Sequence, residues 1–332
     1  MEMPTPRNWP PVSVIMPILN EERYLTDAVT RVLEQDYPGN FELVLALGPS
    51  SDRTTEIAQE LAAADARIRL VDNPAARTPN ALNVAIKAAR HDIIVRVDGH
   101  GLLSDGYIRR AVEVLERTGA ANVGGIMHAE GETEFEHAVA RAMTSRFGIG
   151  GAAFHVGGDE GPADTVYLGT FRRDVLDRLG GYDEHFIRAQ DWELNYRIRK
   201  AEETIWFTPA LRVTYRPRPT LRALASQFFR SGAWRREVVR HYPDTANLRY
   251  LAPPAVVVAI GAGTVAGLAA AAGAPGWLAL GWLAPGGYVG GIAVASLVEG
   301  TGLSMTARAW LPAVLATMHL SWGLGFLTRR RR

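Results

Sequence analysis

Short aliphatic runs alternate with longer, more polar segments over the first 215 residues of the chain. Four runs are rich in β-branched residues and have the continuous apolar pattern of strands buried on both faces: residues 12–16, 41–47, 68–71 and 93–97. A segment long enough for a helix follows each of the first three. Alternation of this kind predicts an α/β domain with a mostly parallel sheet and helices on its two faces.

Polar residues with helix-capping chemistry begin the segments between these strands. Asn20 is predicted to cap the first helix, with Glu21 and Glu22 in its first turn, where carboxylates interact favourably with the helix dipole. The stretch 48–52 leads into a second helix, and residues 80–90 form a third. The chain has no Gly-x-Gly-x-x-Gly after its first strand and no P-loop sequence, which disfavours a dinucleotide-binding fold and a P-loop enzyme.

Beyond residue 250 the pattern changes to long apolar segments. Residues 251–298 contain no Asp, Glu, Lys, Arg or His over 48 positions, well beyond the roughly 20 apolar residues that cross a bilayer. A turn signal at 273–276 interrupts this run and predicts a hairpin of helices over 251–272 and 277–298. A third apolar stretch, 309–327, ends close to four arginines at 329–332. The sequence therefore predicts three transmembrane helices.

The segment that joins the two parts, residues 219–250, is amphipathic. Leu221, Leu224, Ala225 and Phe228 fall at helical spacing, and arginines lie between and after them. A helix of this composition is typical of a membrane surface. The alternative is a helix packed on the soluble domain with its arginines facing water.

Positive charge gives the predicted membrane helices an orientation. Arginines at 235, 236, 240 and 249 precede the first crossing, so the positive-inside rule predicts that the α/β domain lies in the cytoplasm. Three full crossings would put the arginines at 329–332 outside, against the same rule, which leaves a re-entrant or surface-lying third segment open. Residues 1–11 are polar and proline-rich, so no signal peptide is expected.

Charge and cysteine content exclude several classes of partner. The formal net charge of +1 divides into +4 beyond residue 250 and −3 before it. A slightly acidic domain lacks the electrostatic attraction that nucleic-acid binding requires. The chain contains no cysteine, which excludes disulfides and thiolate metal sites.

Two metal-capable side chains follow the fourth strand, in Asp98-Gly99-His100. Ligands of an open α/β sheet bind beyond the carboxyl ends of its strands. In extended chain residues i and i+2 point the same way, so Asp98 and His100 are predicted to hold one divalent cation together. Carboxylate and imidazole suit Mg²⁺ or Mn²⁺, with the imidazole favouring Mn²⁺. The alternative is a turn aspartate beside a surface histidine.

A carboxylate pair begins a later predicted helix, in Gln190-Asp191-Trp192-Glu193. Asp191 has the chemistry of a general base, and the competing interpretation is a helix N-cap. Upstream, the segment 164–173, which ends in Gly169-Thr170-Phe171-Arg172-Arg173, is predicted to be a strand that turns into a helix. Its two arginines are either solvated helix residues or part of the site.

Together these motifs resemble family 2 glycosyltransferases with the nucleotide-sugar-binding GT-A fold, and most of all the membrane-anchored bacterial branch that includes succinoglycan-type exopolysaccharide enzymes. The resemblance covers about residues 12–240. It rests on six motifs in the family's order, namely residues 17–22, 50–54, 98–100, 169–173, 180–184 and 190–193.

The resemblance implies a role for each matching residue. It assigns Pro17, Asn20, Glu21 and Asp52 to the nucleotide pocket, Asp98 and His100 to the metal and diphosphate, and Asp191 to the catalytic base. Gln227 and Arg230 resemble a diphosphate-side Gln-x-x-Arg motif, and Gly169, Thr170, Trp192 and Glu193 fall on the acceptor side. The chain departs from the family at Leu47, where an aspartate usually contacts the base, so the nucleotide stays open.

The expected protein is an inverting, metal-dependent glycosyltransferase of the bacterial plasma membrane. It would comprise a catalytic domain over 1–218, an interfacial segment over 219–250 and transmembrane helices over 251–332. Its donor would be a nucleotide-sugar and its acceptor a lipid-linked saccharide. The alternatives are transfer to polyprenyl phosphate and an inactive nucleotide-sugar-binding scaffold. A processive synthase is disfavoured because the apolar tail is short.

Overall fold

The computed structural model describes residues 8–328, which divide into two compact units. The first contains the described residues up to His128 together with Gly157–Tyr215, and the second contains Ala129–Val156 and the described residues from Arg216 onward. The predicted arginine cluster at 329–332 and the first seven residues of the polar N-terminal segment lie outside the described residues. The predicted boundary at residue 218 remains a prediction.

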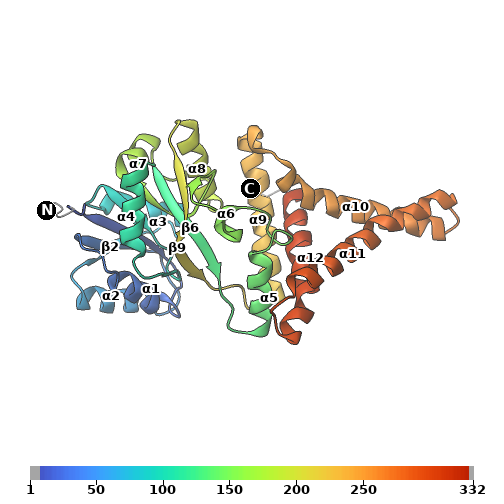
Figure 1. Cartoon of the computed structure of the whole chain (residues 1–332), viewed down its shortest axis with the longest axis horizontal. Coiled ribbons are helices and arrows are strands. Elements are labelled where there is room, and N and C mark those ends of the chain that lie inside the picture. The colour runs from blue at the N-terminus through green and yellow to red at the C-terminus, as the bar shows by residue number, and fades with distance from the viewer. Residues whose placement is uncertain (1–7, 329–332) are drawn as a thin grey trace, which may run out of the picture. The chain divides into compact units, whose positions relative to one another are not determined.

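The first unit is built around one sheet (Figure 1). Its strands are β1 (Val12–Ile18), β2 (Phe41–Leu47), β3 (Ile68–Asp72), β4 (Ile93–Arg96), β5 (Leu102–Leu103), β6 (Asn122–Ala129), β7 (Gly161–Pro162), β8 (Tyr167–Arg172) and β9 (Ile205–Tyr215). Its helices are α1 (Leu25–Leu33), α2 (Thr54–Ala64), α3 (Thr78–Ala88), α4 (Tyr107–Thr118), α7 (Arg173–Leu179) and α8 (Gln190–Lys200).

The order of the strands is β3-β2-β1-β4-β8-β6-β9-β5, with β7 paired to β9. Strands β3, β2, β1 and β4 are parallel, whereas β8 is antiparallel to both β4 and β6. After β3 the chain reverses its direction across the sheet and returns to place β4 beside β1. Since crossovers between parallel strands are right-handed, this reversal puts α3 on the face opposite α1 and α2. The predicted α/β class is confirmed.

Burial explains why these segments form the core. Strands β1, β2 and β4 are buried almost throughout, as expected of parallel strands covered on both faces. Helix α1 buries Leu25, Ala28, Val29 and Val32, which lie at the i, i+3, i+4, i+7 positions of one helical face.

The prediction that Asn20 caps a helix is wrong. Helix α1 begins only at Leu25, and Asn20 has a φ of 55°, in the left-handed region that asparagine tolerates better than most residues. Its side-chain oxygen accepts hydrogen bonds from the backbone N–H and hydroxyl of Ser51, at 2.8 and 3.3 Å. The side chain therefore joins the first two strand–helix loops instead of capping α1.

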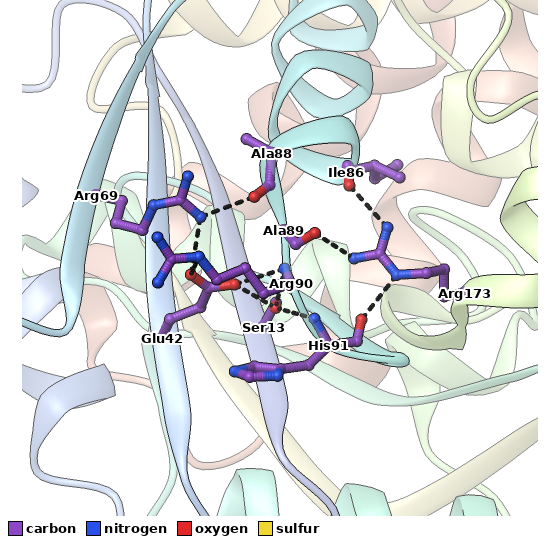
Figure 2. Close-up of polar contacts among 9 residues, drawn as sticks. All are labelled: Ser13, Glu42, Arg69, Ile86, Ala88, Ala89, Arg90, His91 and Arg173. Atoms are coloured by element: carbon purple, nitrogen blue, oxygen red, sulfur yellow. Dashed lines mark hydrogen bonds and ion pairs between the residues drawn. The ribbon is translucent and has the colours of Figure 1, made fainter.

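A buried polar network lies at the amino ends of the parallel strands (Figure 2). Glu42 Oε1 accepts hydrogen bonds from Ser13 Oγ at 2.8 Å and from the backbone N–H of Arg90 at 2.7 Å. Arg69 Nη1 donates to Glu42 Oε2 at 3.0 Å and to the carbonyl of Ala88 at 2.8 Å. This network fixes the starts of β1 and β2 against the end of α3.

Arg173 belongs to the same end of the sheet. Its guanidinium donates to the carbonyls of Ile86, Ala89 and His91, at 3.1, 2.7 and 2.9 Å. These carbonyls lie at and just after the C-terminus of α3, where backbone acceptors lack helical partners. Arg172 donates to the carbonyl of Ala120 at 3.1 Å. Both arginines therefore stabilise the fold by donating to backbone carbonyls. Neither of the two sequence interpretations of these arginines anticipates this role.

The second unit is helical. It contains α5 (Glu134–Met143), α6 (Ala153–Val156), α9 (Leu221–His241), η1 (Pro243–Thr245), α10 (Leu248–Ala271), η2 (Gly276–Trp282), α11 (Leu283–Glu299) and α12 (Met305–Leu327). Three segments are long and apolar enough to cross a membrane: Leu248–Ala271, Gly276–Glu299 and Met305–Leu327. They match the three predicted helices to within a few residues.

Helix α9 packs along α12 within this unit (Figure 1). A Cβ atom at Gly232 would collide with the carbonyl of Trp322, and one at Gly325 would collide with the carbonyl of Phe229. Small residues of this kind let two helix backbones approach closely. Leu224 and Phe228, from the predicted membrane-facing stripe, are buried in the protein.

Candidate active site

The reversal of strand order between β1 and β4 positions a candidate site. Ligands of open α/β sheets bind in the crevice outside the carboxyl ends of the strands at such a switch point. Glu21 follows β1, and Asp98 and His100 follow β4. Residues 79 positions apart in the chain thus meet at one edge of the sheet.

Asp98, Gly99 and His100 form a turn, closed by a 2.8 Å hydrogen bond from the backbone N–H of Gly101 to the carbonyl of Asp98. The prediction that they continue the strand in extended conformation is therefore wrong, because β4 ends at Arg96. A Cβ atom at Gly99 would lie 2.9 Å from Ile18 Cδ1 and 3.0 Å from Glu21 Cγ. Glycine thus lets the turn lie against the end of β1.

His100 is oriented by Glu21. The distance from His100 Nδ1 to Glu21 Oε1 is 2.8 Å, and both side chains are partly buried. A carboxylate bonded to Nδ1 fixes the imidazole tautomer and presents Nε2 as the nitrogen available to a metal ion. The ring of Tyr215 lies beside the imidazole, with ring centroids 6.4 Å apart.

Arg96 lies between the two acidic residues that the sequence assigns to different roles. Its side chain is only 2 % exposed. Its Nε and Nη2 donate to Asp98 Oδ1 at 3.2 and 3.0 Å, and its Nη1 forms an ion pair with Asp191 Oδ1. The guanidinium thus brings Asp98 and Asp191 into one cluster.

Tyrosine rings surround this cluster and make it a low-dielectric site. Arg96 Cζ lies 5.7 Å from the ring centroid of Tyr182. Burial raises the pKa of Tyr182 and, more strongly, that of Tyr167, and the negative charge of Asp98 adds to both effects. Both phenols therefore stay neutral beside the buried guanidinium of Arg96.

Asp191 lies in the first turn of α8 but does not cap it. The residue before the helix, Ala189, has a left-handed backbone and makes no side-chain capping bond. The Asp191 side chain is 34 % exposed. The capping interpretation is therefore excluded, and the carboxylate is both oriented by Arg96 and accessible.

The other predicted acceptor-side residues of α8 lie in different surroundings. Glu193 is fully buried and binds Arg197 through both carboxylate oxygens, at 2.6 and 2.7 Å. Arg197 also donates to the carbonyls of Leu179 and Gly181, both at 2.7 Å, so this pair anchors α8 to the preceding segment. The Trp192 ring stacks on Tyr196 at 5.6 Å.

The predicted nucleotide-side residues lie in the two interlocked loops after β1 and β2. The Thr54 hydroxyl accepts a 2.7 Å hydrogen bond from the backbone N–H of Glu21. Asp52 accepts bonds from the backbone N–H and hydroxyl of Thr54, at 3.1 and 2.5 Å. The hydroxyl bond is the largest cause of the lowered pKa of Asp52. These contacts make the loops one rigid rim beside the site.

Three other predicted residues lie within the sheet. Pro17 pairs in register with Ala46. Gly169 pairs with Arg96, and a Cβ there would collide with the ring of Phe171. Thr170 is fully buried. Close packing accounts for the glycine and the threonine, and an acceptor role for either stays a prediction.

The position of Leu47 is informative. It pairs in register with Asp72, the last residue of β3, which is exposed. A carboxylate therefore exists at this edge of the sheet, one strand away from the position where family resemblance expects it.

Gln227 and Arg230 lie on α9 and belong to the second unit. Gln227 Oε1 accepts a 3.2 Å hydrogen bond from Arg218 Nε, and Arg230 is exposed. Their diphosphate-side role remains a prediction.

The residues of the turn fit a hard divalent cation. Within the part of the chain that the structure describes, both hydrogen bonds from Arg96 to Asp98 end on Oδ1. The other carboxylate oxygen, Oδ2, is thus left for a ligand. An imidazole with a carboxylate partner, beside an aspartate, is a donor set for Mn²⁺ or Mg²⁺.

Sequence reasoning missed Arg96. The available signal was a cationic residue inside a strand that is otherwise aliphatic, since arginine is almost never fully buried without a partner. The partners are not predictable from the strand itself, because Asp191 is 95 positions further along the chain.

Comparisons with known proteins identify the family of the chain. Residues 13–180 match the model of the family described as glycosyl transferase family 2. The chain is 34 % identical over 320 residues to the succinoglycan biosynthesis protein ExoA of Rhizobium meliloti (strain 1021), covering 94 % of this chain and 93 % of that protein.

Two further similarities are more distant. A Methanococcus voltae dolichyl N-acetyl-alpha-D-glucosaminyl phosphate 3-beta-D-2,3-diacetamido-2,3-dideoxy-beta-D-glucuronosyltransferase is 25 % identical over 238 residues, covering 69 % of this chain and 74 % of that protein. The solved mannosyltransferase PcManGT of Pyrobaculum calidifontis, in complex with GDP-Man and Mn²⁺, superposes with a TM-score of 0.59 at 19 % identity, over 95 % of this chain and 88 % of that one. The mannosyltransferase and this chain share the GT-A fold. With its family match and its membrane-type helices, the chain belongs to glycosyltransferase family 2.

Proposed function

We propose that this glycosyltransferase is an inverting, divalent-metal-dependent enzyme that moves one sugar from a nucleotide-sugar to a lipid-linked saccharide. The observation that carries the proposal is the cluster at the switch point of the sheet. There Asp98 and Asp191 bind one buried guanidinium, and His100 is held by Glu21.

The donor side follows from the turn after β4. Asp98 and His100 would hold the cation, and Glu21 would keep the imidazole in the ligating tautomer. When bound, a divalent cation neutralises the charge that develops on a diphosphate leaving group. That the solved mannosyltransferase of the same fold contains Mn²⁺ and GDP-Man supports this assignment.

The acceptor side follows from α8. A sugar hydroxyl must lose its proton as it attacks, and a positioned carboxylate can accept that proton. Of the two carboxylates in the first turn of α8, Glu193 is fully buried and paired with Arg197, whereas Asp191 is accessible. One base without a separate nucleophile supports direct displacement and hence inversion at the anomeric carbon.

A lipid-linked acceptor is consistent with the second unit. Three of its helical segments are long and apolar enough to cross a membrane. The Methanococcus voltae relative is named for transfer to a dolichyl-phosphate-linked sugar, and the Rhizobium meliloti relative for succinoglycan biosynthesis. We place the protein in the plasma membrane with its catalytic part in the cytoplasm, the orientation that the arginines of α9 and early α10 favour.

The test is a donor screen by nucleotide release, with the full-length protein in membranes and extracted lipid acceptors. Asp191→Asn should lower turnover on the order of 10²- to 10⁴-fold, while nucleotide binding persists. Chelation with EDTA should abolish transfer, and Mn²⁺ or Mg²⁺ should restore it. Near wild-type turnover of Asp191→Asn would show that Asp191 is not the base. Full activity in EDTA would show that transfer does not depend on a metal ion.

The acceptor is tested separately. Lipid-linked saccharide, polyprenyl phosphate and a soluble saccharide are compared under the same conditions. Transfer to the lipid-linked saccharide alone supports the proposal. Preference for polyprenyl phosphate would replace it with the alternative activity, and equal transfer to the soluble saccharide would remove the lipid from substrate recognition.

A further inference from the structure

Arg96 contacts both the predicted metal ligand, Asp98, and the predicted base, Asp191. The separate roles of these two carboxylates do not require a common partner. It occupies the last position of β4, immediately before the turn that carries Asp98 and His100. One edge of its guanidinium, Nε and Nη2, binds Asp98 Oδ1, and Nη1 binds Asp191. A single planar cation thus contacts the predicted metal ligand and the predicted base.

The burial of Arg96 makes these contacts energetically significant. An unpaired charge in a protein interior is strongly unfavourable, and removal of one partner of a buried pair leaves the other uncompensated. Burial, the largest single effect, would lower the pKa of Arg96, but the electrostatic and hydrogen-bonding contributions of Asp98 and Tyr182 together outweigh it and raise the pKa above its ordinary value. The guanidinium is therefore always charged and depends on both carboxylates.

Among residues 8–328, the side-chain partner found for both carboxylates is Arg96. Asp191 lies within α8 and is not its N-cap residue, which is Ala189. Asp98 lies in a turn, and its side-chain hydrogen bonds come from Arg96 within the described residues. The five N–H donors of arginine lie in one rigid plane, a geometry that a lysine ammonium cannot reproduce.

We propose that Arg96 is a positioning residue that couples cation binding at Asp98 to the orientation of the catalytic base Asp191. The proposal rests on the function proposed above. The coupling has a definite sign, because the two carboxylates share one cation. When Asp191 loses its charge, Arg96 is compensated by Asp98 alone and binds it more tightly. The arriving metal ion then competes less well for Asp98.

The first experiment needs no change at Arg96. Mn²⁺ affinity of the full-length protein in detergent is measured by electron paramagnetic resonance, without nucleotide or acceptor. We expect Asp191→Asn to weaken Mn²⁺ binding about 10-fold, the lower end of the range for partners that orient metal ligands. Asp177→Asn, at an exposed position of α7, removes the same charge elsewhere and should leave the affinity unchanged. Equal Mn²⁺ affinity of wild type and Asp191→Asn would overturn the coupling.

The second experiment is a double-mutant cycle with Arg96→Lys. In the wild-type background, Arg96→Lys should lower kcat at least about 10-fold, since one ammonium cannot hold both carboxylates. In the Asp191→Asn background it should leave the residual kcat unchanged to within about 3-fold. A loss of kcat as large in both backgrounds would show that Arg96 does not act through Asp191.

The two proposals fail in distinguishable ways. If Asp191→Asn keeps its turnover but weakens Mn²⁺ binding, the coupling stands and the assigned base is wrong. If it loses turnover but binds Mn²⁺ normally, the base stands and the coupling is wrong. Thermal unfolding of each variant, followed by the fluorescence of its tryptophans, identifies a variant that fails to fold, and the Mn²⁺ comparison with intact Arg96 remains decisive in that case.

Discussion

Glu21 Oε1 lies 2.8 Å from His100 Nδ1, between the carboxyl ends of β1 and β4. This contact joins a loop that the sequence assigns to the nucleotide with a turn that it assigns to the metal. Because Gly99 lacks a Cβ, the two segments can lie this close. The pair is therefore the point at which the predicted nucleotide and metal sites meet.

Replacement of Glu21 by Gln should weaken Mn²⁺ binding about 10- to 100-fold, because a neutral amide holds the imidazole tautomer less strongly than a carboxylate does. The measurement is Mn²⁺ titration by electron paramagnetic resonance in the absence of nucleotide. Glu22→Gln is the matched control, since Glu22 contacts the backbone N–H of Arg53 on the rim. An unchanged Mn²⁺ affinity in Glu21→Gln would show that Glu21 has no role in Mn²⁺ binding.

His100→Asp should keep cation binding but shift its preference from Mn²⁺ toward Mg²⁺. Imidazole suits transition metals, whereas an all-oxygen donor set suits Mg²⁺. The ratio of the two metal affinities, measured by competition, checks the prediction. If that ratio is the same as in wild type, His100 is not a ligand.

Glu42→Gln should destabilise the first unit at neutral pH, and the destabilisation should depend on pH. Burial tends to raise the pKa of Glu42, but hydrogen bonds from Ser13, Arg69 and the backbone of Arg90 outweigh it and lower the pKa. A carboxyl with a lowered pKa stabilises the fold above its unfolded pKa and loses that contribution as the pH falls through the folded value.

The expected loss for Glu42→Gln at pH 7 is about 1.5–3 kcal/mol, the range for hydrogen bonds to a charged group. Below about pH 4.3, the ordinary value for glutamate, the difference between wild type and variant should shrink. Thermal unfolding in detergent between pH 3.5 and 8 measures it. A difference that is constant over this range would contradict the assigned role of the charge.

Gly232→Ala should destabilise the second unit by about 1–3 kcal/mol, because the added methyl group meets the carbonyl of Trp322 and separates α9 from α12. Gly261→Ala on α10 is the matched control, since its Cβ would meet nothing within 4 Å. Alanine also favours the helical state over glycine, so the control should be neutral or slightly stabilising. Similar melting temperatures for the two variants would show that α9 and α12 are not closely packed.

The sequence by itself determined the elements and much of the site chemistry. The apolar pattern and the length of each run match one type of element, either a buried strand or a membrane-type helix. For this reason β1, β2, β4 and the three membrane-type helices follow from the local sequence. The residue types in the turn after β4 indicate a hard cation for the same local reason. Sequence resemblance then identified the family, which the comparisons confirm.

Only the tertiary structure decided how these residues meet. The φ of Asn20 depends on the neighbouring loop that its side chain binds, and the turn at Asp98 depends on contact with Glu21 across the switch point. The role of Arg96 becomes apparent only from its contact with Asp191. Helix α9, which packs on α12, buries Leu224 and Phe228 within the protein. Burial and pairing between positions far apart in the chain decide these features, and local periodicity carries no record of such contacts.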